Sequence, residues 1–307
     1  MNDAAIYGRD LFGDPIVRRA AGPVAERFVM PPFTVLDARG GEWQERKRAW
    51  ASMGIKGEVG RDAAAIHCPN KSNDEGMEDA NYTSIFDPTM CELAVRWFAP
   101  EGGQIVDPFA GGSVRGIVAG ALGRKYWGCD LRAEQVAANE VQADDIDPAV
   151  RPVWVCGDSM EALSDAPPAD LVFSCPPYGD LERYSDDPAD LSTMEWHTFV
   201  AAYKRIILRC VQRMKPDSFA CFVVGDFRDP KGFYRNFVGT TVAAFEECGA
   251  RLYNEAILVT SVGSAAMRVT KQFTSGRKLA KTHQNVLGVC TGAGRAASAR
   301  HAASSAG

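Results

Sequence analysis

The chain has 307 residues, of which 46% are hydrophobic, and a formal net charge of −5. This length can bury a substantial core, so we expect one large α/β domain with an extension. There is no apolar run long enough to cross a bilayer and no signal-peptide pattern, which predicts a cytoplasmic protein with no membrane partner. The nine scattered cysteines include no C-x-x-C pair, so we expect neither a disulfide framework nor a metal site.

The charge is unevenly distributed along the chain. No acidic residue follows Glu255, and residues 256–307 carry seven basic side chains, which leaves −12 for the first 255 residues. The net negative charge argues against an indiscriminate polyanion binder. A basic C-terminal face on an acidic body instead favours a protein that meets nucleic acid with one surface.

Residues 1–83 are predicted to form an N-terminal extension and a polar link. Within them, residues 31–37 are typical of a turn and a short strand, and residues 43–50 of a helix with mixed charges. Residues 69–82 are polar, acidic and rich in turn-forming residues, which predicts a loop. The next predicted helix, residues 87–98, has Pro88 at its start and apolar side chains at helical spacing.

Three successive predicted strands end in an acidic residue. The strand at 105–106 runs into Asp107, the strand at 126–129 into Asp130, and the strand at 153–156 into Gly157-Asp158. A Gly-Gly turn at 111–112 opens a helix, which lets a ligand approach backbone N–H groups. The turn lacks the dinucleotide fingerprint, but Asp130 has the spacing of an acid that binds a ribose diol. We therefore expect a nucleoside-bearing cofactor.

A fourth predicted strand, residues 170–175, ends in two prolines. Because proline has no N–H to donate, the strand must stop there and turn rigidly. The turn carries Ser174, Cys175 and Tyr178. In α/β sheets, ligands bind at the carboxyl ends of the strands, so these side chains are candidates for chemistry.

The remaining elements predict a mostly parallel twisted sheet with helices on both faces and an antiparallel hairpin at its C-terminal edge. We expect a crossover helix over 194–214, a strand over 219–226, a helix from 232 to 248, and hairpin strands at 252–259 and 286–290. The insertion 263–282 contains no acid and is the candidate DNA-contacting segment. Its candidate DNA-binding residues are Arg268, Lys271, Gln272, Arg277, Lys278 and Lys281. Residues 292–307 are predicted to be a disordered tail.

The sequence Asp107-Pro-Phe-Ala-Gly-Gly-Ser113 resembles the S-adenosylmethionine-binding loop of DNA methyltransferases. Cys175-Pro176-Pro177-Tyr178 resembles their catalytic (Asp/Asn/Ser)-Pro-Pro-(Tyr/Phe) turn. The likeness covers residues 84–291, the predicted methyltransferase domain, and is to the enzymes that methylate the exocyclic amino groups of adenine and cytosine. It implies a Rossmann-like class I methyltransferase fold acting on double-stranded DNA.

The resemblance also assigns site residues. Asp107 and Gly111 would line the methionine end of the cofactor, Asp130 would bind its ribose and Asp158 would meet its adenine, while the flipped target base would stack on Tyr178. The full set of implied cofactor residues is Asp107, Pro108, Phe109, Ala110, Gly111, Gly112, Ser113, Asp130, Leu131, Asp158 and Ser159.

Cys175 departs from the family pattern, because a thiol is a poor hydrogen-bond acceptor. We favour a covalent role, in which its thiolate attacks cytosine C6 to activate C5, with Glu182 or Glu255 as the acid toward ring N3. The alternative is amino methylation, in which Ser174 or a backbone carbonyl holds the amino group. A third hypothesis is a cysteine that only packs.

Two other classes of protein fit the same sequence. The same motifs serve RNA methyltransferases, and a catalytically dead DNA-binding module could keep the fold. The chain lacks a large separate target-recognition domain, so we expect a short recognition site, a dimer or a partner protein. Its size and uneven charge suit a restriction-modification, phage or mobile-element enzyme.

Overall fold

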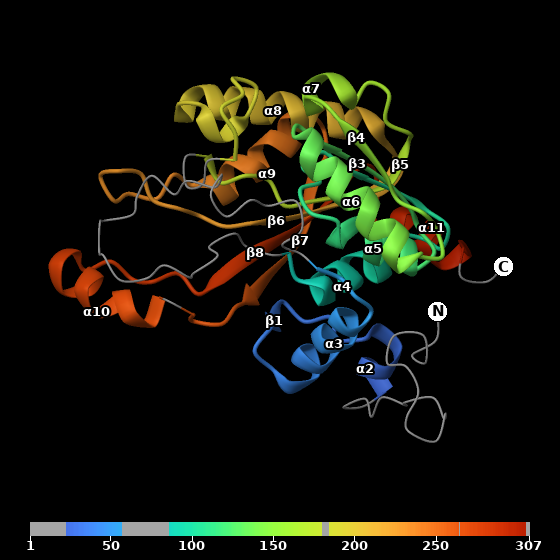
Figure 1. The fold of residues 1–307 in the computed structure, drawn as a ribbon, viewed down its shortest axis with the longest axis horizontal. Coiled ribbons are helices and arrows are strands. Elements are labelled where there is room, and N and C mark those ends of the chain that lie inside the picture. The colour runs from blue at the N-terminus through green and yellow to red at the C-terminus, as the bar shows by residue number, and fades with distance from the viewer. Residues whose placement is uncertain (1–22, 57–85, 180–183, 264, 305–307) are drawn as a thin grey trace.

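The computed structural model describes residues 23–56, 86–179, 184–263 and 265–304. They form one sheet of eight described strands in the order β1-β7-β8-β6-β5-β2-β3-β4, with helices on both faces (Figure 1). Neighbouring strands are parallel except that β8 runs antiparallel to both β6 and β7. The expected Rossmann-like, mostly parallel architecture is therefore confirmed.

The strands are β1 (Val35–Asp37), β2 (Gln104–Asp107), β3 (Lys125–Asp130), β4 (Val153–Cys156), β5 (Ala169–Ser174), β6 (Met214–Val224), β7 (Arg251–Val259) and β8 (His283–Cys290). The helices are α2 (Pro23–Phe28), α3 (Gly41–Ser52), α4 (Pro88–Phe98), α5 (Val114–Ala121), α6 (Ala133–Ile146), α7 (Ser159–Ala162), α8 (Trp196–Arg213), α9 (Phe237–Glu247), α10 (Ala265–Gly276) and α11 (Gly294–Ser304), with the 3₁₀ turn η2 at Leu191–Thr193.

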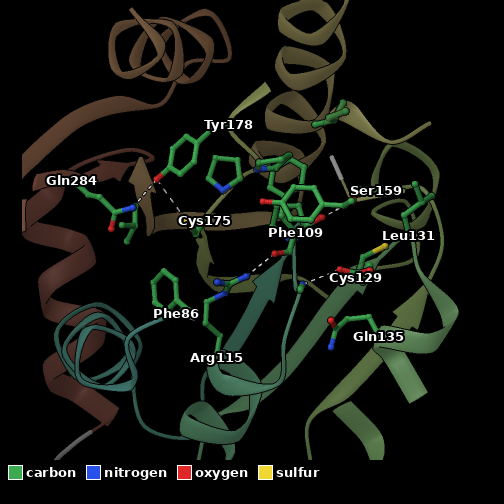
Figure 2. A pocket seen from close by; sticks show the side chains of 18 of the residues that line it. Phe86, Phe109, Arg115, Cys129, Leu131, Gln135, Ser159, Cys175, Tyr178 and Gln284 are labelled. Carbon is green, nitrogen blue, oxygen red and sulfur yellow. Dashed lines mark hydrogen bonds between the residues drawn. The ribbon is translucent and has the colours of Figure 1, made fainter. Parts of the chain in front are cut away.

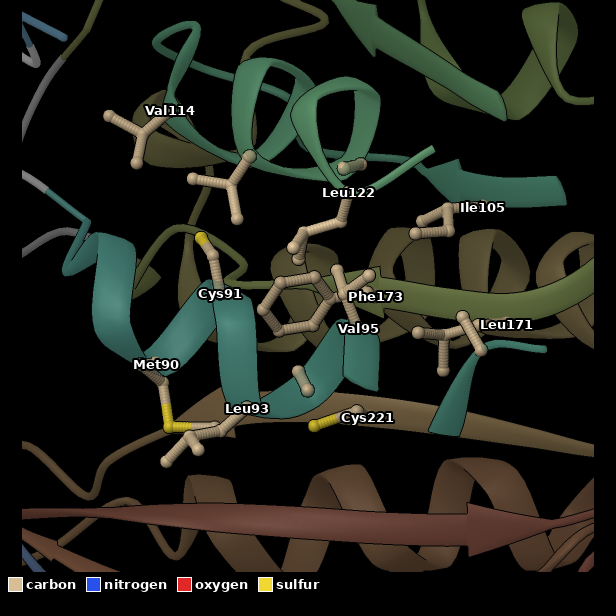
Figure 3. Close-up of a cluster of buried hydrophobic side chains, with 14 of the residues drawn as sticks. Met90, Cys91, Leu93, Val95, Ile105, Val114, Leu122, Leu171, Phe173 and Cys221 are labelled. Atoms are coloured by element: carbon tan, nitrogen blue, oxygen red, sulfur yellow. The ribbon is translucent and has the colours of Figure 1, made fainter. Parts of the chain in front are cut away.

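The apolar core lies in two layers. Side chains from α3, α4, α5, α6 and α11 pack on one face of the sheet, and side chains from α7, α8 and α9 pack on the other. Figure 3 shows the first layer, in which Leu93 and Val95 of α4 belong to the same buried cluster as Phe173 and Cys221 of the sheet. The crossover helix predicted over 194–214 is α8, whose stripe of buried apolar residues is core, as expected.

Three expectations need correction. The β7–β8 hairpin is not the edge of the sheet, because β1 from the N-terminal extension pairs in parallel with β7 outside it. The insertion at 263–282, for which the sequence predicts no helix, contains helix α10, every described residue of which is at least partly exposed. The segment 294–304, predicted to be disordered, is helix α11.

Helix α11 is held to the sheet by its own side chains. Ala297 is buried in the core, and Arg300 donates a 2.7 Å hydrogen bond to Asp170 and another to the carbonyl of Pro216. The alanine-rich composition of this segment also favours helix formation. The contacts with Asp170 and Pro216 hold the segment on the sheet as an ordered helix.

Among the described residues, no helix is both long and apolar enough to span a membrane. The same ranges hold no cluster of three or more His, Cys, Asp or Glu side chains suited to a metal ion.

A buried ion pair joins helix α3 of the N-terminal extension to helix α4. Arg46 on α3 is 1% exposed and donates two hydrogen bonds to Glu92 on α4, which also accepts from Trp50 at 2.8 Å. Burial alone would raise the pKa of Glu92, but the hydrogen bonds and positive charge of Arg46, with the charge of Arg96, hold it below its ordinary value. Helix α3 is thus part of the folded core.

We expect Arg46→Met to lower the free energy of unfolding by about 3–5 kcal/mol, because it leaves the Glu92 carboxylate buried without its main partner. Chemical denaturation followed by circular dichroism measures the change. Arg48→Met is the matched control, since Arg48 lies on the same helix but is exposed, and should change stability by less than about 0.5 kcal/mol. Equal stability of the two variants would contradict a structural role for the ion pair.

Candidate functional site

A cavity of about 420 Å³ runs along the carboxyl edge of the sheet. Its lining follows the order of the strands across the sheet. At one end it includes residues that follow β4, β3 and β2, and in the middle the turn after β5. At the other end it includes residues of β6, β8 and β7 and the segment after β1. Figure 2 shows Phe109, Leu131 and Ser159 on one side and Cys175, Tyr178 and Gln284 on the other. The volume falls within the roughly 300–1,000 Å³ of typical ligand pockets. We call these two parts the cofactor half and the acceptor half.

The carboxylate of Asp107 lies behind the cavity wall and forms hydrogen bonds to residues of both halves. It is fully buried at the end of β2 and accepts from the amide of Phe109 at 3.1 Å, the hydroxyl of Ser174 at 2.5 Å, Arg115 Nε at 2.6 Å and the hydroxyl of Tyr126 at 2.8 Å. Both Asp107 and Ser174 therefore have a structural role, since neither lines the cavity.

Arg115 on α5 lies below Cys175 in the cavity wall (Figure 2). Burial would lower its pKa, but the negative charge of Asp107 raises it above its ordinary value, so the guanidinium is permanently charged. Arg115 also donates to the carbonyls of Phe109 and Ala110, and its guanidinium lies 4.7 Å from the ring centre of Phe86. It thereby fixes the cofactor loop against the strand that carries Cys175.

Asp130 at the end of β3 has the geometry of a ligand-binding carboxylate. One oxygen accepts from the amide of Gly111 and the other from the amide of Arg132, both at 2.9 Å, and the residue lines the cavity. Burial raises its pKa above the ordinary value. The far side of the loop is held by Asn139, which donates to the carbonyl of Gly111 at 2.7 Å.

The predicted cofactor residues divide into two groups in the structure. Those that line the cavity are Pro108, Phe109, Gly111, Asp130, Leu131, Asp158 and Ser159. Those that lie behind it and shape the loop are Asp107, Ala110, Gly112 and Ser113. Ser113 donates to Gln142 at 2.5 Å, and the Ser159 hydroxyl donates to the carbonyl of Pro108. These residues fit a bound nucleoside cofactor, because polar groups and backbone amides converge on one elongated cavity.

Cys175, Pro176, Pro177 and Tyr178 all line the acceptor half. The Cys175 sulfur lies 3.9 Å from the Tyr178 hydroxyl, which accepts from Gln284 Nε2 at 2.8 Å. Burial raises the pKa of Tyr178 well above its usual value, so the phenol is neutral. Gly179 ends the turn with φ of +54°, and a side chain there would lie 3.1 Å from Phe227, so glycine is required.

The two candidate acids have different outcomes. Glu182 lies outside the described residues. Glu255 is exposed on β7, accepts from Asn285 at 2.8 Å and does not line the cavity. Its position therefore does not support the expected role as an acid toward a base beside Cys175.

The candidate DNA-binding residues lie on and after α10, on the carboxyl-edge side of the molecule (Figure 1). Arg268, Lys271, Gln272, Arg277 and Lys278 are exposed. Lys281 is half-buried beside the acceptor half: a side-chain carbon at Gly225 would lie 3.5 Å from Lys281 Cε and 3.9 Å from the Tyr178 hydroxyl. The insertion thus leads directly into the site.

Several lining residues were not predicted from the sequence. Gln284 is the second residue of β8, while Ala38, Gln44 and Lys47 bring the N-terminal extension into the cavity wall. The predicted strand and helix at 31–50 were signals for an ordered segment, but no local pattern indicated that it would reach the cavity.

We expect Asp130→Asn to weaken S-adenosylmethionine binding about 10-fold to 100-fold, because hydrogen bonds to a charged group contribute about 1.5–3 kcal/mol. Isothermal titration calorimetry measures this affinity. Asp165→Asn is the control, since Asp165 is exposed and outside the cavity. The raised pKa of Asp130 means that its charge is lost earlier than usual as pH falls, so wild-type affinity should decline with it. Unchanged affinity of Asp130→Asn would exclude the ribose role.

The chain is similar to several proteins of known structure. Residues 37–141 match the family model described as DNA methylase, and no curated protein matches the chain. Among solved structures, TrmN from Thermus thermophilus is similar over 67% of this chain and 49% of its own, with 12% identity and a TM-score of 0.45. The magnesium protoporphyrin IX methyltransferase from Synechocystis, solved with bound SAM, matches over 66% and 79%, with 10% identity and a TM-score of 0.42.

A putative DNA modification methylase, also from Thermus thermophilus, is 17% identical over 45% of this chain and 52% of its own, with a TM-score of 0.33. These structural likenesses are too low to carry an argument about activity. The family match and the motifs are what link this chain to DNA methylases. The match begins at Asp37, the last residue of β1, includes α3 and the cofactor loop, and ends before the Pro-Pro-Tyr turn. Residues 37–141, about a third of the chain, are thus similar to DNA methylases.

Proposed function

We propose that the protein methylates the exocyclic amino group of a base, adenine N6 or cytosine N4, flipped out of double-stranded DNA. The observation that carries this proposal is the arrangement of the acceptor half, where the Pro-Pro-Tyr turn and the Gln284 amide face the same cavity as the cofactor loop. The name of the matching family model, which refers to N6 and N4 methylation, agrees with it.

S-adenosylmethionine supplies an electrophilic methyl group when it is bound. The protein must hold the amino nitrogen in line with that methyl group and accept a hydrogen bond from one of its N–H groups, which makes the nitrogen more nucleophilic. Gln284 donates through Nε2 to Tyr178, so Oε1 of the same amide remains an acceptor. The ring of Tyr178 offers a face for stacking the base.

The geometry gives less support to C5 methylation. That reaction needs a thiolate and an acid for ring N3, and of the two candidate acids Glu255 does not line the cavity, while Glu182 lies outside the described residues. The cation beside Cys175, Arg115, is already engaged by Asp107. One observation keeps C5 methylation as a second candidate: Cys175 lines the acceptor half, where a flipped cytosine would be bound.

Nucleoside mass spectrometry of DNA from cells expressing the protein tests the target atom. We expect N6-methyladenine or N4-methylcytosine. Cys175→Ser should retain the modification at a rate within about tenfold of wild type, because no covalent bond to the base is required. Methylated nucleosides in RNA but not in DNA would refute the DNA substrate.

The competing mechanism makes the opposite prediction. If the product is 5-methylcytosine and Cys175→Ser abolishes it, the amino proposal is wrong and Cys175 is the covalent nucleophile.

We expect the double variant Arg277→Glu, Lys278→Glu to weaken DNA binding and to reduce the salt dependence of the binding constant, with log K against log [salt] shallower by about 2. Both side chains are exposed on the carboxyl-edge side, where they can contact phosphate. The control is Lys125→Glu, Arg295→Glu, which makes the same charge change at exposed positions at the opposite edge of the sheet. Identical titrations for the two variants would remove this segment from the interface.

A further inference from the structure

A short hairpin follows β6 and projects from the carboxyl edge on the same side as α10 (Figure 1). Arg228 pairs with Tyr234 in an antiparallel bridge, and the amide of Asp229 donates to the carbonyl of Phe233 at 2.8 Å. The Asp229 carboxylate accepts from the amide of Phe233 at 2.8 Å, and Arg228 donates to the carbonyl of Gly232 at 2.8 Å. These bonds fix the backbone of the hairpin.

The foot of the hairpin is packed against the catalytic turn. Phe227 is 7% exposed, and its ring centre lies 6.2 Å from that of Tyr178 and 5.8 Å from that of Phe237. Arg235, at the other end of the hairpin, lies over the ring of Trp196 at 4.9 Å. The tip is therefore held at a set position relative to the acceptor half of the cavity.

The tip itself carries an exposed aromatic ring with two lysines near it. Phe233 is 71% exposed. A side-chain carbon at Gly232 would lie 2.7 Å from Lys278 Nζ, so the candidate DNA-binding segment packs on the hairpin at this point. Lys231 is exposed next to Gly232. A single exposed aromatic residue is common on protein surfaces, but here it stands on a fixed support, beside two lysines and linked to the catalytic turn.

We propose that Phe233 inserts into the DNA duplex and occupies the space that the target base leaves when it moves into the cavity. Proteins use apolar side chains in this way to hold unstacked base steps apart, and lysines beside the wedge would contact the flanking phosphates. The inference rests on the proposed action on a flipped base. It adds the residue that stabilises the flipped state and explains why the tip remains uncovered.

The test compares methyl transfer from tritiated S-adenosylmethionine to native and to heat-denatured genomic DNA from a methylation-deficient host, which needs no knowledge of the recognition site. We expect Phe233→Ala to lower the rate on native DNA by about tenfold or more, because it loses the stacking of one aromatic side chain. On denatured DNA, where the base is already unpaired, the rate should stay within about twofold of wild type. Phe233→Trp should restore most of the activity on native DNA.

The control is Phe33→Ala. Phe33 is 70% exposed before β1, at the opposite edge of the sheet, and its replacement should leave both rates unchanged. An equal loss on native and denatured DNA for Phe233→Ala, or no loss on either, would overturn the wedge. If the wild-type protein methylates neither form of DNA, the proposed function fails, and the inference fails with it. That result differs from the first two outcomes, in which the wild-type protein is active.

Discussion

The buried carboxylate of Asp107 is the interaction on which the site depends. A buried charge is costly unless it is paired and hydrogen-bonded, and Asp107 meets this requirement with donors from four segments: the cofactor loop, β3, α5 and β5. One of these donors, Ser174, immediately precedes Cys175. The cofactor loop and the strand that leads into the Pro-Pro-Tyr turn are thus attached to the same two oxygen atoms, which fixes their positions relative to each other.

The acceptor half is stabilised by an ion pair on one face of the sheet and by aromatic contacts on the other. On one face, the Arg46–Glu92 pair attaches α3 and its lining residues to α4. On the other, Phe227, Phe237 and Trp196 form an aromatic cluster whose ring centres are 5.6 to 6.2 Å apart, and Tyr178 joins it edge-on. Edge-to-face contacts of this kind restrict ring rotation, so the Tyr178 ring is held in one orientation in the cavity wall.

The sequence was sufficient to predict the parts of the fold and site that depend on local pattern. The strands ending at Asp107, Asp130 and Ser174 were recognisable from apolar runs that end in turn chemistry, and the position of Tyr178 followed from the two prolines. Contacts between distant segments were not predictable in the same way. The pairing of β1 with β7 and the approach of Gln284 to Tyr178 depend on register across the sheet, which no local pattern encodes. The helix at 294–304 was missed because its anchor, Asp170, lies far away in the sequence.

The outer position of β1 has a consequence for the order in which the protein can assemble. Val35 lies opposite Ile257, so nearly the whole described chain separates the two partners. On the ribosome, β2, β3 and β4 can pair early and form the cofactor half, while β1 must wait until β7 has emerged. Ala38, which follows β1, then takes its place in the cavity wall. During biosynthesis the cofactor half is therefore complete before the acceptor half is closed, and a nascent chain that stalls before β7 lacks this wall.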